Sequence, residues 1–314
     1  MRRLRRVVQG IFLTLFLVLL VRTQLGDKGA SGRWAELFFN LDPLVLASTV
    51  LSTHAVGAGL LAATATVVLT LLLGRAFCGW ICPLGTLNAM AGALRRKPGP
   101  GPTATEDPTP WHRAKYYLLA ALLTSSLFGA HLIGFFDPFS ILYRGIATGF
   151  LPAAQYGVEE GANAIYGMDP HVGPVHATAV TEPVYRFLRD DLFIAKRQTF
   201  LGGPLLFAIL LAVLGLNLVR KRFWCRYLCP LGALLGLLSR RPLLRWSKDG
   251  LKCTQCGRCK ADCQGAAGPD RLGGANPSEC YLCLNCGARR NWEASTLCLG
   301  SPLRRPSDAR LDLS

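Results

Sequence analysis

Long uncharged, apolar runs recur along the chain, and the charged residues lie between them. Three runs hold no charged residue at all, and a fourth, near the N-terminus, is shorter; they cover residues 44–74, 116–136, 198–219 and 7–21. One helix needs about 20 consecutive apolar residues to cross a bilayer. The pattern therefore predicts a membrane α-helical protein with about four transmembrane helices, the run at 44–74 including a lead-in before its helix.

The first run has two interpretations. It follows four arginines within the first six residues, a positive start that a secretory signal peptide and a membrane anchor share. No small-residue cleavage site follows, because residues 22–27 have the wrong composition. We favour an uncleaved anchor, with the signal peptide as the alternative.

Charge alternates from one side of the predicted spans to the other. The chain is 51% hydrophobic and carries a net charge of +16. By segment, the charge is +4 before residue 7, zero over 22–43, +4 over 74–115, −2 over 137–197 and +10 from residue 220. Basic residues favour the cytoplasmic side. This predicts a multi-pass protein of the bacterial inner membrane with both termini in the cytoplasm, and the basic surplus needs no nucleic-acid partner.

Seven cysteines near the C-terminus form two tight groups. Their spacing is C-x2-C-x2-C-x3-C followed by C-x2-C-x2-C, at Cys253, Cys256, Cys259, Cys263, Cys280, Cys283 and Cys286. Such triplets wrap a cubane iron–sulfur cluster, whereas zinc sites use separated C-x2-C pairs. Disulfides require an oxidising compartment, and all twelve cysteines lie in segments predicted to be cytoplasmic. The pattern predicts [4Fe–4S] clusters, with zinc as the alternative.

The apolar part of the chain contains an internal repeat. Residues 75–87 match residues 222–234, each with the motif Cys-x3-Cys-Pro-Leu-Gly, and an Asp-Pro step precedes each copy. Two predicted spans separate the copies, so the halves point the same way. The motif cysteines are Cys78, Cys82, Cys225 and Cys229.

Cys-x3-Cys places two thiols one helical turn apart on one face. Pro83 and Pro230 then suit the first turn of a new helix. The two copies give four thiols on one membrane face, enough in number for a third cluster at the membrane surface. The alternative is that these are reduced structural cysteines.

The predicted organisation has five parts. The fold class is a membrane α-helical part of two parallel repeats plus a small α+β ferredoxin-like domain for two [4Fe–4S] clusters. The parts are a first repeat at 1–97, a cytoplasmic linker at 98–114, a second repeat at 115–246, the ferredoxin-type domain at 247–300 and a tail at 301–314. The second repeat contains an extracytoplasmic loop.

These motifs make the chain resemble the membrane polyferredoxins of the NapH and NosR kind. The resemblance implies electron transfer between the quinone pool and a redox partner protein, as a quinol dehydrogenase component. It also offers an alternative, an assembly or regulatory factor that supplies electrons for maturation of a respiratory metalloenzyme. A zinc-stabilised scaffold is a third class. The sequence indicates no catalytic residue beyond this relay.

The resemblance also implies a ligand exchange between the two tail motifs. Cys263 would complete the cluster of Cys280, Cys283 and Cys286. The cluster of the first triplet lacks its fourth cysteine, because Arg290 stands where one is expected. Cys298 is the spare thiol that could serve; otherwise the site holds a three-iron cluster or a non-cysteine ligand.

Five histidines and two aspartates are further candidates. Intramembrane polar groups are costly, so His54 and His131 are either quinol or haem contacts or interfacial residues. The expected places of the others are interfacial for His112 and solvated for His171 and His176. Asp42 and Asp137 are expected to cap helices, with a proton-accepting role at the quinol side as the alternative for Asp137.

Overall fold

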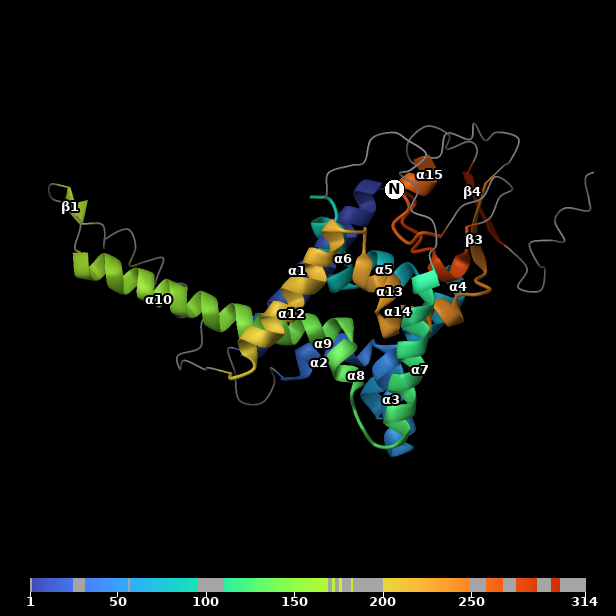
Figure 1. The fold of residues 1–314 in the computed structure, drawn as a ribbon, viewed down its shortest axis with the longest axis horizontal. Helices are drawn as coiled ribbons and strands as arrows, with labels where there is room; N and C mark the ends of the chain where they lie inside the picture. The colour runs from blue at the N-terminus through green and yellow to red at the C-terminus, as the bar shows by residue number, and fades with distance from the viewer. Residues whose placement is uncertain are drawn as a thin grey trace, which may run out of the picture.

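The fold is a computed structural model and is mostly helical (Figure 1). It describes residues 2–24, 32–55, 57–94, 110–168, 171–172, 175–176, 182, 200–248, 258–267, 275–286 and 295–299. The α-helices are α1 (Arg2–Gln24), α2 (Gly32–Asn40), α3 (Pro43–Thr53), α4 (Ala62–Leu73), α5 (Ala76–Trp80), α6 (Pro83–Ala91), α7 (Ala114–Leu127), α8 (Ile133–Phe136), α9 (Pro138–Arg144), α10 (Leu151–Met168), α12 (Gly203–Gly215), α13 (Phe223–Tyr227), α14 (Pro230–Leu238) and α15 (Arg258–Ala261). Shorter helical turns are η1 (Ala58–Leu61), η3 (Pro110–Arg113), η4 (Gly145–Phe150), η5 (Leu216–Leu218) and η6 (Pro277–Glu279).

The prediction of four transmembrane helices is wrong. Among the described residues, one helix is long and apolar enough to cross a membrane, over Arg3–Thr23 within α1. The other apolar helices are shorter, at Pro43–Thr53, Ala62–Leu73 and Gly203–Leu218. A helix of 12 residues is about 18 Å long, against a hydrocarbon core of about 30 Å.

Backbone breaks inside the uncharged runs cause this difference. The run at 44–74 divides into α3 and α4, because His54 ends α3 in the left-handed conformation with φ of 55°. In the run at 116–136, α7 ends at Leu127 and Gly129 turns the chain with φ of 79°. Lack of charge therefore marked apolar segments correctly but did not reveal where their helices end.

The prediction of an α+β ferredoxin-like domain is also wrong. In the described part of the C-terminal segment, the regular elements are the four-residue α15, the turn η6 and the strand β4 (Ser295–Leu299). Strand β4 pairs antiparallel with β3 (Leu244–Lys248), which crosses the boundary predicted at residue 247. The other described strands, β1 (His171–Val172) and β2 (Val175–His176), form a separate short pair. The described part of the cysteine-rich segment is held by contacts with the helices.

The two repeats form the centre of the molecule. Helices α5 and α6 of the first copy and α13 and α14 of the second lie between α1 and α7 (Figure 1). Asp42 and Asp137 cap α3 and α9, which confirms that prediction. A cluster of aromatic rings from α1, α2, α5 and α9 fills the space between the repeats, and it comprises Phe16, Phe38, Phe39, Phe77 and Phe139.

The region predicted as an extracytoplasmic loop begins with helix. After α9, the turn η4 continues into α10, an 18-residue helix that projects away from the body (Figure 1). Two close packing points anchor this segment, because Gly149 and Gly203 let η4 and α12 approach. The described residues of this segment carry no cysteine, so the candidate chemistry remains in the body of the molecule.

Candidate iron–sulfur sites

Each repeat motif folds into a helix, a turn at the second cysteine and a new helix. Cys82 and Cys229 are the N-caps of α6 and α14, and their sulfurs accept hydrogen bonds from the N–H groups of Gly85 at 3.4 Å and Gly232 at 3.3 Å. Pro83 and Pro230 each begin the new helix, as predicted. A Cβ at Gly85 would lie 2.7 Å from the carbonyl oxygen of Cys78, so the closed turn requires glycine.

The structure brings the four motif cysteines together. Cys78, Cys82, Cys225 and Cys229 are all buried, with 4–7% of their surface exposed. Burial raises the pKa of the Cys229 thiol, and neighbouring Cys225 and Cys78 raise it further. Each thiol pair therefore lies within electrostatic reach of the other pair, across the interface between the repeats.

Two arginines flank this group, one from each repeat. Arg75 and Arg222 stand three residues before Cys78 and Cys225 and are 0% and 1% exposed. Arg222 donates a hydrogen bond to the carbonyl oxygen of Cys78 at 3.0 Å, so it reaches from the second repeat into the first. The sequence analysis assigned no function to these arginines, because basic residues at the end of an apolar run are expected on the cytoplasmic side of a membrane span.

The arginines provide a test of whether an iron–sulfur cluster fits. The Nε and Nη2 atoms of Arg75 and Arg222 are buried and have no hydrogen-bond acceptor among the described residues. A buried N–H group is costly unless it donates a hydrogen bond. A cluster held by four thiolates is an anion whose sulfurs accept hydrogen bonds, and hydrogen bonds and net charge set its potential. The four cysteines and the unused Nε and Nη2 donors of the two arginines therefore fit a cluster bound between the repeats.

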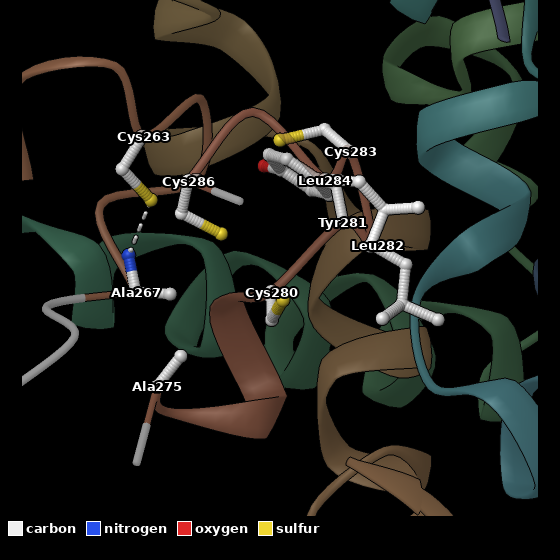
Figure 2. A pocket seen from close by; sticks show the side chains of 10 residues that line it. Cys263, Ala267, Ala275, Cys280, Tyr281, Leu282, Cys283, Leu284 and Cys286 are labelled. Carbon is white, nitrogen blue, oxygen red and sulfur yellow. Dashed lines mark hydrogen bonds between the residues drawn. The ribbon is translucent and has the colours of Figure 1, made fainter. Parts of the chain in front are cut away.

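A second group of four cysteines lies in the C-terminal segment. Cys263, Cys280, Cys283 and Cys286 line one hollow, as Figure 2 shows. Its empty space is about 420 Å³, part of it open to solvent. Burial, followed by the neighbouring Cys283, raises the pKa of Cys280 to about 12. These are the four residues that the sequence assigned to the more complete tail cluster.

The backbone around Cys283 takes an unusual path. Leu282 and Leu284 both have positive φ, 45° and 53°, which is uncommon for residues other than glycine. Strained conformations of this kind persist only when the surroundings fix them, and they gather at functional sites. Here the two turns enclose Cys283 and allow the segment to curl around the hollow (Figure 2). This curled path fits the wrapping of a cubane by a C-x2-C-x2-C segment.

The remaining predicted ligands are only partly covered by the structure. Cys253 and Cys256 lie outside the described residues. Cys259 lies on α15 and is partly exposed. Cys298 lies on β4, where its backbone pairs with Arg245, but its side chain is outside what the structure describes. Among the described residues, no three His, Cys, Asp or Glu side chains converge as ligands of a single metal ion.

Tyr281 connects the two cysteine groups. It follows Cys280 in the chain, and its hydroxyl donates a hydrogen bond to the carbonyl oxygen of Cys225 at 3.2 Å. The guanidinium groups of Arg75 and Arg222 lie over its ring, 4.7 and 5.0 Å from the centroid. Tyr281 thus fixes one group against the other.

The residue that follows the first cysteine of each motif contacts the C-terminal segment, but it does so differently in the two repeats. In the first repeat, Gly79 allows close approach, since a Cβ there would lie 2.2 Å from the carbonyl oxygen of Tyr281. In the second repeat, Arg226 donates hydrogen bonds to the carbonyl oxygens of Gln264 and Cys263 at 2.8 and 2.9 Å. The repeat has therefore diverged so that both copies hold the C-terminal segment.

A buried ionic cluster completes the docking. Glu279 accepts hydrogen bonds from Arg75 at 3.0 Å and from Lys115 at 2.6 Å. Burial alone would raise the pKa of Glu279, but Arg75 and Lys115 hold it below its usual value. The negative charge on η6 is thereby fixed between α5 and α7.

The candidate histidines lie away from both cysteine groups or have other partners. His54 and His131 are exposed. His112 was expected at an interface, yet it is buried, and its ring packs against Tyr227 with centroids 4.7 Å apart. His171 and His176 pair through their backbones in β1 and β2.

Comparison with known families places the four motif cysteines inside a recognised domain. The family described as 4Fe-4S binding domain matches residues 56–100 and 202–250. These two segments contain Cys78, Cys82, Cys225 and Cys229 and none of the seven tail cysteines.

The chain is also similar to several curated proteins. The methylamine utilization ferredoxin-type protein MauN of Methylorubrum extorquens is 32% identical over 71% of this chain and 59% of its own length. The regulatory protein NosR of Pseudomonas aeruginosa is 30% identical over 71% of this chain and 25% of its own length. The ferredoxin-type protein NapH of Haemophilus influenzae is 29% identical over 71% of this chain and 59% of its own length. The chain thus spans less than two thirds of each of these relatives, and no solved structure matches it.

Proposed function

We propose that the chain is a NapH/NosR-like ferredoxin-type protein that binds [4Fe–4S] clusters and carries electrons between the membrane quinone pool and a redox partner protein; the matched 4Fe-4S binding domain and the similarity to MauN, NosR and NapH support this. A [4Fe–4S] cluster supplies one-electron oxidation and reduction when bound. The protein's own residues hold the clusters, set their charge environment and fix the distance between them.

We assign two cluster sites from the described residues. Cys78, Cys82, Cys225 and Cys229 would hold one cluster between the repeats. A second would be held by Cys263, Cys280, Cys283 and Cys286. The first tail triplet, Cys253, Cys256 and Cys259, would hold a further cluster completed by Cys298.

The observation that carries the proposal is the direct link between the two described groups. Tyr281 is adjacent to Cys280 and bonds to the backbone of Cys225, so one residue spans from one ligand set to the other. Its ring contacts two buried cations, and water is excluded around it, since Tyr281 is 1% exposed. A short, rigid and dry path of this kind suits electron transfer between two centres.

Helix α1 supports a membrane location. One side of it exposes an apolar stripe, comprising Leu4, Val7, Ile11, Leu15 and Val18. The other side packs against the body through Phe16 and Leu20, while Gln9 donates a hydrogen bond to the carbonyl oxygen of Gly79 at 2.7 Å. A helix with one packed side and one exposed apolar side fits contact with lipid on the outer face.

The N-terminal arginines indicate which side of the membrane holds the tail. Arg5 donates hydrogen bonds to Gln264 at 3.4 Å and to Asn285 at 3.3 Å, so the start of α1 lies beside the second cysteine group. Figure 1 accordingly places the N-terminus next to α15. Arginines before a span favour the cytoplasm. We therefore place both the N-terminus and the tail cysteines on the cytoplasmic side.

A role in assembly or regulation is the second candidate, and one finding favours it: a relative, NosR, is named a regulatory protein. Both roles need the same clusters. They differ in whether quinol reduces the clusters during steady turnover of a respiratory partner.

The first prediction concerns iron content and cluster signals. We expect anaerobically purified protein to contain iron and acid-labile sulfide and to show reduced-cluster EPR signals. Cys283→Ser should remove the signal of the tail group and leave that of the repeat group, and Cys229→Ser should do the reverse, because each thiol serves one group. Stoichiometric zinc in place of iron would end the electron-transfer proposal. With iron present, the absence of any quinol-dependent reduction in membrane vesicles would favour the assembly role.

A further inference from the structure

Two buried aspartates face each other between the repeats, apart from both cysteine groups. Asp42 and Asp137 occupy equivalent Asp-Pro positions, and both are 0% exposed. Asp42 Oδ1 accepts a hydrogen bond from the Leu44 N–H at 2.7 Å, and Asp137 Oδ2 accepts one from the Ser140 N–H at 2.8 Å. Helix capping therefore uses one oxygen of each carboxyl group.

The other two oxygens have no hydrogen-bond donor among the residues that the structure describes. Asp42 Oδ2 and Asp137 Oδ1 are both buried. The two side chains lie within hydrogen-bonding reach of each other. Ionised carboxylates only accept hydrogen bonds, and two adjacent buried negative charges are costly. One proton held between the carboxyl groups satisfies both orphaned oxygens and removes one charge.

The surroundings decide which aspartate carries the proton. The Asp137 carboxylate accepts a hydrogen bond from the Ser140 N–H, and the Ser140 hydroxyl and the backbone of Phe139 lie close enough to favour its charged form. Asp42 accepts a hydrogen bond from the Leu44 N–H, and the backbone of Val45 favours its charged form. Val45 stands at the position in the first repeat that Ser140 holds in the second, so the first repeat lacks the hydroxyl donor. Asp137 is therefore the better place for the negative charge.

We propose that Asp42 and Asp137 form a single-proton site between the two repeats, with the proton bound to Asp42 Oδ2 and donated to Asp137 Oδ1. The titratable group that faces each carboxyl group is the other carboxyl group. Burial and backbone N–H groups also affect the proton affinity of both, and the Ser140 hydroxyl affects that of Asp137. Paired carboxyl groups that share one proton behave as one site that gains or loses it.

The site lies near the cysteine group of the repeats. Phe77 precedes Cys78, Phe139 follows Asp137 by two residues, and the two rings are 6.1 Å apart between centroids. The region between them is apolar and therefore of low dielectric, where opposite charges attract more strongly. An electron added at the cysteine group should therefore raise the affinity of the aspartate pair for a second proton from solvent. This coupling, unlike the proton site itself, rests on the proposed function.

Infrared spectroscopy of the full-length protein in detergent tests the site. We expect a carbonyl band of a protonated carboxylic acid at neutral pH that shifts in D2O. Asp42→Asn should abolish the band. Asp137→Asn should retain it at a shifted frequency, because Asp42 then donates to an amide oxygen. Asparagine caps helices as well as aspartate, so α3 and α9 should still begin normally, and Glu36→Gln, an exposed carboxyl on α2, is the control.

Absence of the band from the wild type, or an unchanged band in Asp42→Asn, would overturn the proton site. Ser140→Ala leaves both carboxyls in place and gives an independent test: loss of the hydroxyl donor should shift the band, and an unaltered frequency would contradict the assignment to Asp42. On reduction with dithionite, the wild-type band should increase. A static band beside a reduced iron signal would refute only the coupling, whereas protein without iron would refute the proposed function and leave the proton site standing.

Discussion

Glu279→Gln is expected to detach the C-terminal cysteine segment and to destabilise its docking by about 3–5 kcal/mol, the range found when one partner of a buried ion pair is removed. The reason is geometric. Glu279 holds Arg75 and Lys115, whose side chains are both 0% exposed. Glutamine keeps the volume and one acceptor but removes the charge, so Arg75 and Lys115 both lose their carboxylate partner.

The expected consequence is selective. Glu279 lies on η6, immediately before Cys280, so the tail group should lose its cluster signal first while the repeat group keeps its own. Limited proteolysis should cleave the segment after residue 275 faster than in the wild type. Glu36→Gln removes an exposed carboxyl of the same type and should change neither measurement. Adding Lys115→Met to Glu279→Gln should recover part of the loss, since it removes one of the stranded cations; failure to recover any would assign the effect to something other than charge.

The cysteine groups could be predicted from the sequence because thiol ligands recur at fixed local spacing. The spacing of Cys280, Cys283 and Cys286 already indicated a wrapped cluster, and the paired Cys-x3-Cys-Pro motifs indicated a second set on the same face. The structure gathers the thiols of each set, and their binding of a cluster stays a prediction. Gly85 lets the first turn close, and Gly232 leaves room for the Arg75 guanidinium beside the second.

The helix lengths could not be predicted in the same way. An uncharged run indicates that a segment is apolar, but it does not indicate where the helix ends and the backbone turns. His54 ends α3 in a left-handed conformation, and Gly129 turns the chain after α7; neither residue breaks the hydropathy of its run. The predicted ferredoxin-like domain failed for a related reason: a cysteine triplet specifies a path around a cluster, and that path here depends on Arg226 and Tyr281 rather than on a sheet.

The docking residues were missed because each had a simpler explanation. Arg75 and Arg222 end apolar runs, where positive charge is expected on topological grounds alone. The signal that could have identified them is their equivalence: both stand three residues before a first motif cysteine, in both copies of the repeat. A basic residue at the same spacing from a candidate ligand in both repeats indicates a role beside that ligand rather than at the membrane surface.

The equivalent positions of these two arginines lead to the second prediction with a large expected effect. Arg75→Gln and Arg222→Gln are each expected to lower the reduction potential of the cluster proposed between the repeats. Adding an electron makes an anionic cluster more negative, and a nearby buried cation stabilises that reduced form. For unit charges about 7 Å apart at an effective dielectric of about 20, the interaction is about 2 kcal/mol, or roughly 100 mV for a one-electron couple.

Potentiometric titration of the EPR signals measures this shift directly. Arg222→Gln is the cleaner variant, because Arg75 also binds Glu279 and its loss should loosen the tail as well. Arg144→Gln is the matched control, since Arg144 lies over the ring of Phe135 at 5.3 Å and contacts neither cysteine group. The tail signal reports whether docking survives. A potential that stays constant in Arg222→Gln, with both signals intact, would show that these guanidinium groups serve packing around Tyr281 and not the charge of a cluster.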